Sequence, residues 1–269
     1  MTDAVQLSLA HIDIKADASL QDFDAPSFAP IVAAALELAE GKIRELYLFG
    51  NAGTGKSHLL SAIHRHALNT QKRAIFLSLK DIIDTDVQAL AGLEMFHLIV
   101  IDDIDVAQGR RHWQEALFHL INRAREQKRQ LVYSAKVAPG ELGFELMDLV
   151  TRLSQALSFG LPDGSLSEDR RALLNAILRQ KGWQLPDTIK DFMVSEGPHH
   201  AGDMTQVLSA IAPYFHYKSR RLPQKLIEEI KNHIREESLL AELADFVDEH
   251  EDEDEYIQTL DLPMTHYLD

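Results

Sequence analysis

The chain has 269 residues, 45% of them hydrophobic, and a formal net charge of −15. This length allows one large core or two smaller ones. The absence of cysteine excludes a disulfide framework and a thiolate metal site. No apolar run approaches the length that crosses a bilayer, so we expect no membrane association and a cytoplasmic location.

The negative charge is concentrated at one end. Thirteen Asp/Glu and no Lys/Arg lie from Glu236 to Asp269, and such composition is typical of a disordered acidic tail, expected over 236–269. The rest of the chain is close to neutral. Because binding to the phosphate backbone of DNA requires a basic face, we expect no tight direct DNA binding.

The first 18 residues precede any predicted helix or strand and are expected to form a flexible peptide. They include Gln6, Leu7, Ser8 and Leu9. A peptide of this pattern can place two leucines in apolar pockets of a partner, with the glutamine amide fixing its register. The pattern is short, so by itself it indicates little. A helix rich in alanine is predicted next, over 28–40, and Gly41 ends it.

Short apolar runs then alternate with helical segments. Strands are predicted over 45–49, 74–79, 97–101, 130–134 and 156–161, and helices over 57–69, 81–90, 112–126 and 146–154. This alternation is typical of a parallel sheet with helices on both faces. The sequence therefore predicts an α/β nucleotide-binding domain with a five-stranded sheet over 19–163.

The strand pattern stops at residue 163. Helices are predicted over 167–180 and 201–217, with others beginning at Asp187 and after Pro223. These helices predict a small α-helical lid domain over 164–235.

One stretch between the first strand and the next helix matches GxxxxGK[ST], the phosphate-binding loop. Its glycines allow backbone N–H groups to surround a polyphosphate, and the helix that follows presents its positive end to the same anion. Lys56 would reach the outer phosphates, and Ser57 would bind Mg²⁺. The candidate ligands of ADP or ATP are Gly50, Gly53, Thr54, Gly55, Lys56, Ser57 and His58.

A second motif follows about 45 residues later, where an apolar strand ends at Asp102 and Asp103. In P-loop NTPases one such carboxylate holds Mg²⁺ and the next orients the attacking water. We assign Asp102 to Mg²⁺ and Asp103 to water activation. Without the phosphate loop, two carboxylates facing solvent at the end of a strand would be the simpler interpretation.

Arg152 lies at the end of the last helix before the fifth strand. A guanidinium there could act in trans, as an arginine finger on a nucleotide bound by a neighbouring protein. If the chain were an isolated domain, a surface arginine in an ordinary salt bridge would be the simpler interpretation of Arg152.

These motifs together resemble the AAA+ ATPases related to the bacterial replication initiator DnaA, and within them the regulatory inactivators of that initiator. The resemblance extends from Gln6 to about Ile230. It rests on the N-terminal tetrapeptide, the phosphate loop and the segments 101–105, 113–118, 148–153 and 185–187.

The resemblance implies an AAA+ core followed by a lid, and a role in inhibiting replication. Residues 6–9 would bind the β sliding clamp of DNA polymerase III. Arg152 would provoke hydrolysis of the ATP bound to DnaA. In place of the initiator's DNA-binding domain this chain has the acidic tail, which favours the regulator.

Three features depart from the family pattern. Ala10-His11 follows the tetrapeptide, where a proline or a bulky apolar residue is usual. Met204 stands where a lid arginine senses nucleotide, and Ser134 begins a segment that in DnaA contains an acidic sensor. The last two predict weak or absent hydrolysis by this chain. A loader or adaptor of the replicative helicase and a metabolic P-loop kinase remain alternatives, and self-association is left open.

Overall fold

The computed structural model describes residues 18–216 and 223–240, which form two compact units. The first contains described residues up to Trp183 together with 199–202, and the second contains 184–198, 203–216 and 223–240. The predicted clamp-binding peptide Gln6–Leu9 and the residues from 241 onward lie outside the described residues.

The first unit contains a five-stranded parallel sheet in the order β2-β3-β4-β1-β5. Its strands are β1 (Glu45–Phe49), β2 (Ala74–Ser78), β3 (Leu98–Asp102), β4 (Gln130–Ala135) and β5 (Leu157–Gly160). The predicted fold class is confirmed, and each predicted strand end differs from the observed end by at most one residue. Because all strands are parallel, their carboxyl ends share one edge of the sheet.

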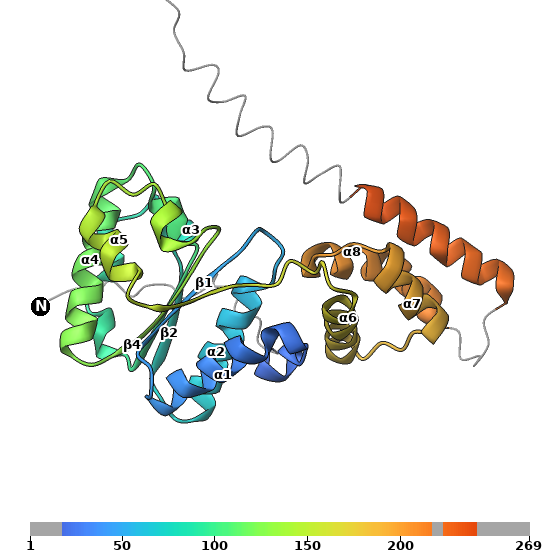
Figure 1. The fold of residues 1–269 in the computed structure, drawn as a ribbon, viewed down its shortest axis with the longest axis horizontal. Coiled ribbons are helices and arrows are strands. Elements are labelled where there is room, and N and C mark those ends of the chain that lie inside the picture. The colour runs from blue at the N-terminus through green and yellow to red at the C-terminus, as the bar shows by residue number, and fades with distance from the viewer. Residues whose placement is uncertain (1–17, 217–222, 241–269) are drawn as a thin grey trace, which may run out of the picture. The chain divides into compact units, whose positions relative to one another are not determined.

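Helices cover both faces of the sheet (Figure 1). On one face α1 (Ala29–Glu40) and α2 (Lys56–Asn69) pack on alternate strand residues such as Leu46 and Leu48. On the other face α4 (Arg111–Glu126) and α5 (Met147–Leu153) pack on the intervening residues, such as Tyr47. The central strands are therefore apolar on both sides, as the continuous apolar runs predict.

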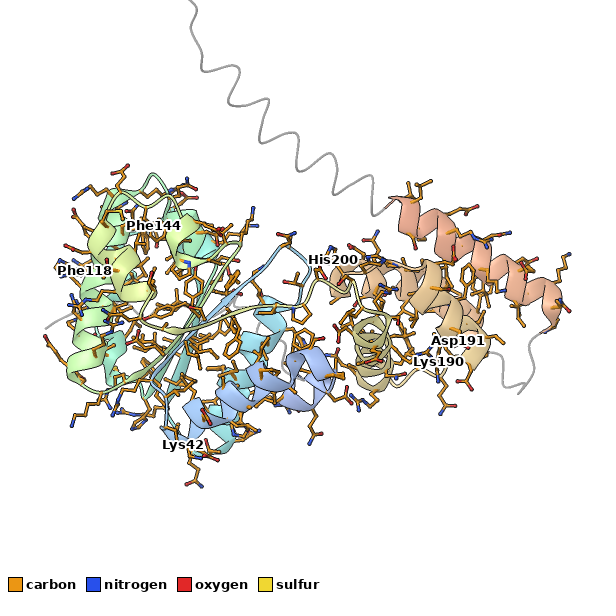
Figure 2. The ribbon with its side chains drawn as sticks, in the orientation of Figure 1. Lys42, Phe118, Phe144, Lys190, Asp191 and His200 are labelled. Atoms are coloured by element: carbon orange, nitrogen blue, oxygen red, sulfur yellow. The ribbon has the colours of Figure 1, made fainter. Side chains whose placement is uncertain are left out.

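The side chains on the α4 face make the larger of two apolar clusters. Trp113 is fully buried there, Phe144 is also buried, and Phe118 packs on the cluster while partly exposed. Figure 2 shows Phe118 and Phe144 in this layer of the first unit.

One predicted helix is broken in two. The helix expected over 81–90 is replaced by α3 (Leu79–Ile82) and a 3-10 turn at Val87–Leu90. The Thr85 hydroxyl donates to the carbonyl of Ile82, and the Asp86 carboxylate accepts from the backbone of Gln88. Such local hydrogen bonds from side chains compete with helix continuation, which explains the break.

Two further 3-10 helices, η1 (Leu20–Phe23) and η2 (Pro26–Phe28), precede α1, and α6 (Ser167–Lys181) contacts both. The Ser27 hydroxyl donates to the Asp169 carboxylate at 2.7 Å. These contacts place α6 in the first unit, so the compact division falls after Trp183 and not at residue 163.

The second unit is helical, with α7 (Asp187–Glu196), α8 (Ala201–Ile211), the 3-10 helix η7 (Ala212–His216) and a helix over 224–240. Residues of α8 belong to this unit from Asp203 on. Met193, Met204 and Ile234 are fully buried. Lys231 and Arg235 lie over the Phe192 ring, 5.2 and 4.9 Å from its centre.

Candidate nucleotide site and the Arg152 helix

The predicted phosphate loop joins the carboxyl end of β1 to the start of α2. Gly53 and Gly55 have φ angles of 75° and 92°, in the left-handed region that glycine adopts without strain. Gly55 is the N-cap of α2, and no side chain caps this helix. The first N–H groups of α2 thus have no side-chain acceptor, and together with the loop they can bind an anion.

Lys56 is buried at the start of α2. Its ammonium donates to the carbonyls of Gly50 at 2.6 Å and Asn51 at 2.8 Å, and so closes the loop on itself. Burial lowers the pKa of Lys56, although the carboxylates of Asp103 and Asp102 oppose that shift. A phosphate entering the loop would offer this ammonium stronger acceptors than two neutral carbonyls.

Asp102 and Asp103 end β3 at the same sheet edge as the loop. Asp102 is buried, and the Ser134 hydroxyl of β4 donates to its carboxylate. The same hydroxyl accepts from the Asp103 N–H at 3.0 Å. Ser134 therefore links the two predicted acidic residues to the neighbouring strand. The sequence does not reveal this role, because Ser134 lies about 30 residues after the acidic pair.

Asp103 has a left-handed backbone with φ of 56°, an uncommon conformation for a residue other than glycine. Burial raises the pKa of its carboxyl to about 6, with Asp102 and Asp105 adding to the shift and Lys56 and Lys80 opposing it. The carboxylates of Asp102 and Asp103 and the Ser57 hydroxyl are oxygen ligands of the kind that Mg²⁺ prefers, although no cluster of three or more acidic or histidine side chains in the described residues is arranged to hold a metal ion on its own. The residues present therefore fit a magnesium nucleotide.

We expect Asp103→Asn to stabilise the protein at pH 7 when nucleotide and Mg²⁺ are absent. The folded-state pKa of about 6 exceeds the ordinary value of 3.8, so the wild type loses stability as pH rises from about 4 to 6. After allowance for solvent screening, the gain at pH 7 is about 1 kcal/mol, which is a few degrees in Tm. Thermal melts at pH 4 and 7 measure it, and an equal gain at both values would contradict it.

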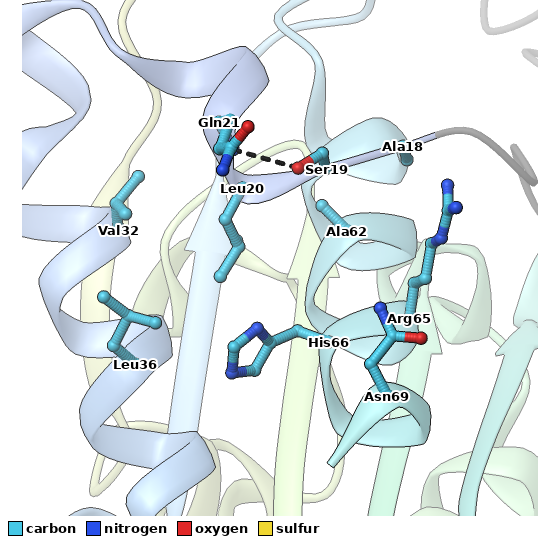
Figure 3. A pocket seen from close by; sticks show the side chains of 10 residues that line it. All are labelled: Ala18, Ser19, Leu20, Gln21, Val32, Leu36, Ala62, Arg65, His66 and Asn69. Carbon is cyan, nitrogen blue, oxygen red and sulfur yellow. Dashed lines mark hydrogen bonds between the residues drawn. The ribbon is translucent and has the colours of Figure 1, made fainter.

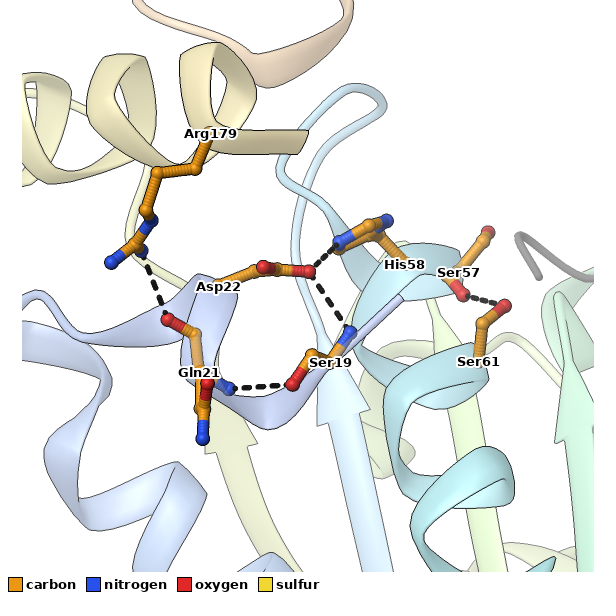
Figure 4. Close-up of polar contacts among 7 residues, drawn as sticks. All are labelled: Ser19, Gln21, Asp22, Ser57, His58, Ser61 and Arg179. Carbon is orange, nitrogen blue, oxygen red and sulfur yellow. Dashed lines mark hydrogen bonds and ion pairs between the residues drawn. The ribbon is translucent and has the colours of Figure 1, made fainter. Parts of the chain in front are cut away.

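A polar cluster joins η1 to the first turn of α2. His58 Nε2 lies 2.9 Å from the Asp22 carboxylate, which also accepts from the Ser19 N–H at 2.9 Å (Figure 4). From α6, Arg179 donates to the Gln21 carbonyl at 3.1 Å. His58 was predicted as a nucleotide ligand on its position after Ser57, and the structure shows that its ring also fastens η1 beside the loop.

The segment 199–202 approaches the phosphate loop within the first unit. The Ala201 N–H donates to the Gly53 carbonyl at 3.1 Å. A Cβ built on Gly53 would lie 3.0 Å from the Cβ of His200. Glycine at position 53 is therefore favoured by this close approach as well as by its φ angle.

A cavity of about 470 Å³ lies between η1, α1 and α2 (Figure 3). It is lined by Ala18, Ser19, Leu20, Gln21, Val32, Leu36, Ala62, Arg65, His66 and Asn69. Its α2 residues come from the middle and end of the helix and none from the phosphate loop. This cavity is therefore separate from the predicted nucleotide site.

Arg152 lies in the last turn of α5 and is partly exposed. Its carbonyl accepts from the guanidinium of Arg125 at 2.8 Å. No hydrogen bond or ion pair of its own guanidinium is found among residues 18–216 and 223–240. The main chain at Arg152 is thus fixed, while its charged group stays available to a partner.

Comparison with known proteins decides the family. The model of the bacterial DnaA ATPase domain matches residues 24–162, which is more than half of the chain. The chain belongs to the DnaA-related family of AAA+ proteins. The matched range includes the phosphate loop, both acidic residues and Arg152, so the predicted resemblance is confirmed at family level.

Similar proteins include the chromosomal replication initiator DnaA of Cereibacter sphaeroides, 31% identical over 179 residues that cover 61% of this chain and 38% of that protein. The chain thus spans well under two thirds of this relative. Among solved structures, domain III of Thermotoga maritima DnaA has a TM-score of 0.70 at 22% identity, covering 82% of this chain and 98% of that one.

AMPPCP-bound DnaA of Aquifex aeolicus has a TM-score of 0.64 at 19% identity, covering 75% of this chain and 67% of that one. These two structures share the fold of this chain.

Among the described helices, none combines the length and the apolar character that a bilayer crossing needs.

Proposed function

We propose that this protein regulates the initiation of chromosome replication in the manner of Hda, the regulatory inactivator of DnaA. It binds the β sliding clamp through Gln6–Leu9 and stimulates hydrolysis of the ATP bound to DnaA. The geometry at Arg152 carries this proposal. The Arg152 guanidinium is partly exposed and has no partner in the described part of the chain, and Arg125 fixes the last turn of its helix. Such a guanidinium can bind the phosphates of a nucleotide held by another protein.

The protein's own loop holds ADP or ATP with Mg²⁺ in this proposal. Gly50, Gly53, Thr54, Gly55, Lys56, Ser57 and His58 surround the nucleotide, while Ser57 and Asp102 hold Mg²⁺ and Asp103 orients water. Hydrolysis at this loop is weak, because the neutral Ser134 lies beside the acidic pair and Met204 is buried in the second unit. The bound nucleotide then stabilises the structure that presents Arg152.

A reconstituted reaction tests the proposal. ATP-bound DnaA is mixed with this protein in the presence or absence of DNA-loaded β clamp, and release of inorganic phosphate is followed. We expect acceleration of about a thousandfold that requires the clamp. Absence of acceleration contradicts the proposal, and binding to replicative helicase without regard to clamp would instead support a helicase loader or adaptor.

We expect Gln6→Ala together with Leu9→Ala to weaken clamp binding at least tenfold. The glutamine amide and two leucines are the only anchors that the peptide is proposed to offer, and loss of each anchor typically costs 1 to 3 kcal/mol. Surface-bound β clamp and soluble full-length protein measure the effect. Thr2→Ala, in the same N-terminal segment but outside the tetrapeptide, is the matched control, and unchanged binding by the double variant would exclude Gln6–Leu9 as the clamp site.

A further inference from the structure

We propose that Arg125 is a positioning residue for Arg152. This inference rests on the proposed function, because it concerns how the arginine that acts on the partner's nucleotide is held. Arg125 lies in the last turn of α4, whereas Arg152 lies in the last turn of α5. The two helices pack side by side on the same face of the sheet.

The Arg125 guanidinium bonds to strand β1, to the end of α5 and to the turn that follows α5. Its Nε and Nη2 bind the two Glu45 carboxylate oxygens at 2.5 and 2.7 Å, a bidentate pair with the first residue of β1. Its Nη1 donates to the Gln155 side-chain oxygen at 2.7 Å, and Nη2 also donates to the Arg152 carbonyl at 2.8 Å. Arg125 therefore ties the end of α5 to the sheet.

Within this network the Arg125–Glu45 pair is shielded from water, whereas Gln155 is exposed. The Arg125 side chain is 21% exposed and that of Glu45 is 12% exposed. The hydrogen bonds with Glu45 raise the pKa of Arg125, and the fully buried Tyr133 ring lies nearby. Bidentate charge-assisted hydrogen bonds in such a setting fix geometry more tightly than an exposed ion pair does.

The end of α5 needs such support. The helix has seven residues, and its last carbonyls accept from the turn that follows: the Gln155 N–H donates to the Arg152 carbonyl at 3.2 Å, and the Ser154 N–H donates to that of Val150 at 2.9 Å. The Arg125 charge lies at this C-terminal end, where the helix dipole favours a cation. Without the Arg125 contact these local bonds would remain, but the end of α5 would lose its tie to Glu45 on β1, and the backbone that carries the Arg152 side chain would be held less firmly.

Position matters for an arginine that compensates charge in a transition state. A displacement of about 1 Å can cost about a hundredfold in rate while binding changes little. The inference therefore predicts a defect in the maximal rate of DnaA-bound ATP hydrolysis, with the concentration of protein required for half-maximal stimulation preserved.

Three variants test this: Arg125→Ala, Arg125→Lys and Gln155→Ala. Each is titrated into ATP-bound DnaA with DNA-loaded β clamp. We expect Arg125→Ala to lower the maximal rate at least tenfold and to change the half-maximal concentration less than twofold. Lysine can bind Glu45 but cannot reach all acceptors, so it should restore part of the rate, and Gln155→Ala should lower the rate two- to fivefold.

Arg123→Ala is the matched control. Arg123 lies on the same turn of α4 but pairs with Glu94 at 3.3 Å, away from α5. We expect its maximal rate to match the wild type. If Arg125→Ala does not fold, Arg125→Lys and Gln155→Ala decide the matter, because each keeps part of the network.

The outcomes separate the inference from the proposed function. If Arg152→Ala abolishes stimulation while the Arg125 and Gln155 variants keep the wild-type maximal rate, the positioning role is wrong and the function stands. A shift only in the half-maximal concentration also overturns the positioning role, because it indicates a binding surface. If Arg152→Ala has no effect, both ideas fail together.

Discussion

Replacing Arg152 with alanine is expected to abolish stimulation of DnaA-bound ATP hydrolysis, with a loss of about a thousandfold. An arginine finger contributes about 10³ to 10⁵ to the rate, because it compensates charge that develops on the transferring phosphoryl group. The Arg152 guanidinium makes no ion pair or hydrogen bond within residues 18–216 and 223–240, so its removal breaks no polar contact among them. We therefore expect unchanged Tm, unchanged nucleotide affinity and unchanged clamp binding.

Arg152→Lys tests whether a positive charge alone is enough or whether the planar guanidinium is needed. Lysine keeps a positive charge but lacks the planar fork that matches phosphate oxygens, so most of the stimulation should still be lost. Single-turnover phosphate release from ATP-bound DnaA measures both variants. Full stimulation by Arg152→Ala would show that Arg152 plays no catalytic role in the partner's reaction.

The sheet and the phosphate loop were predictable because their signals are local. Continuous apolar runs define buried parallel strands, and the two faces observed at Leu46 and Tyr47 follow from the alternation of side chains along a strand. The spacing of the loop residues requires a strand before and a helix after, and both are present.

The environment of the acidic residues was not predictable in the same way. Asp102 and Asp103 could be assigned by pattern, but the hydroxyl that binds both comes from Ser134 on another strand. Pairing of β3 with β4 sets that contact, and register between distant strands is a tertiary property. The left-handed backbone of Asp103 likewise depends on its surroundings, since only glycine adopts it freely.

The same reason explains why Arg125 was missed. In the sequence it is one of several basic residues near the end of a helix, with acceptors 80 and 30 positions away. The break between α3 and the turn at Val87–Leu90 has a local signal in Thr85 and Asp86, whose side-chain hydrogen bonds to the backbone outweigh the helical periodicity of this segment.

Lys56→Ala is expected to weaken binding of ADP or ATP at least a hundredfold. The ammonium binds the Gly50 and Asn51 carbonyls, and the Thr54 hydroxyl also donates to that of Asn51. The truncated loop therefore keeps the bonds from the Thr54 hydroxyl and the Thr54 N–H to the Asn51 carbonyl, so folding should survive. What is lost is a buried charge facing the phosphates, and removal of such a partner typically costs 2 to 5 kcal/mol.

Lys72→Ala is the matched control, since Lys72 also donates to a main-chain carbonyl, that of Ala39 at 2.6 Å. It lies after the end of α2, so its loss should leave nucleotide affinity unchanged. Calorimetric titration of each variant with Mg-ADP measures the difference. Wild-type affinity in Lys56→Ala would exclude the loop as the nucleotide site.

A pH dependence strengthens this test because burial lowers the pKa of Lys56. Phosphate binding favours the charged ammonium and raises that pKa, so binding at alkaline pH requires uptake of a proton. Wild-type affinity should then fall as pH rises into the alkaline range, and the affinity of Lys56→Ala should lack this fall. Equal pH profiles for the two proteins would show that the ammonium does not face the phosphates.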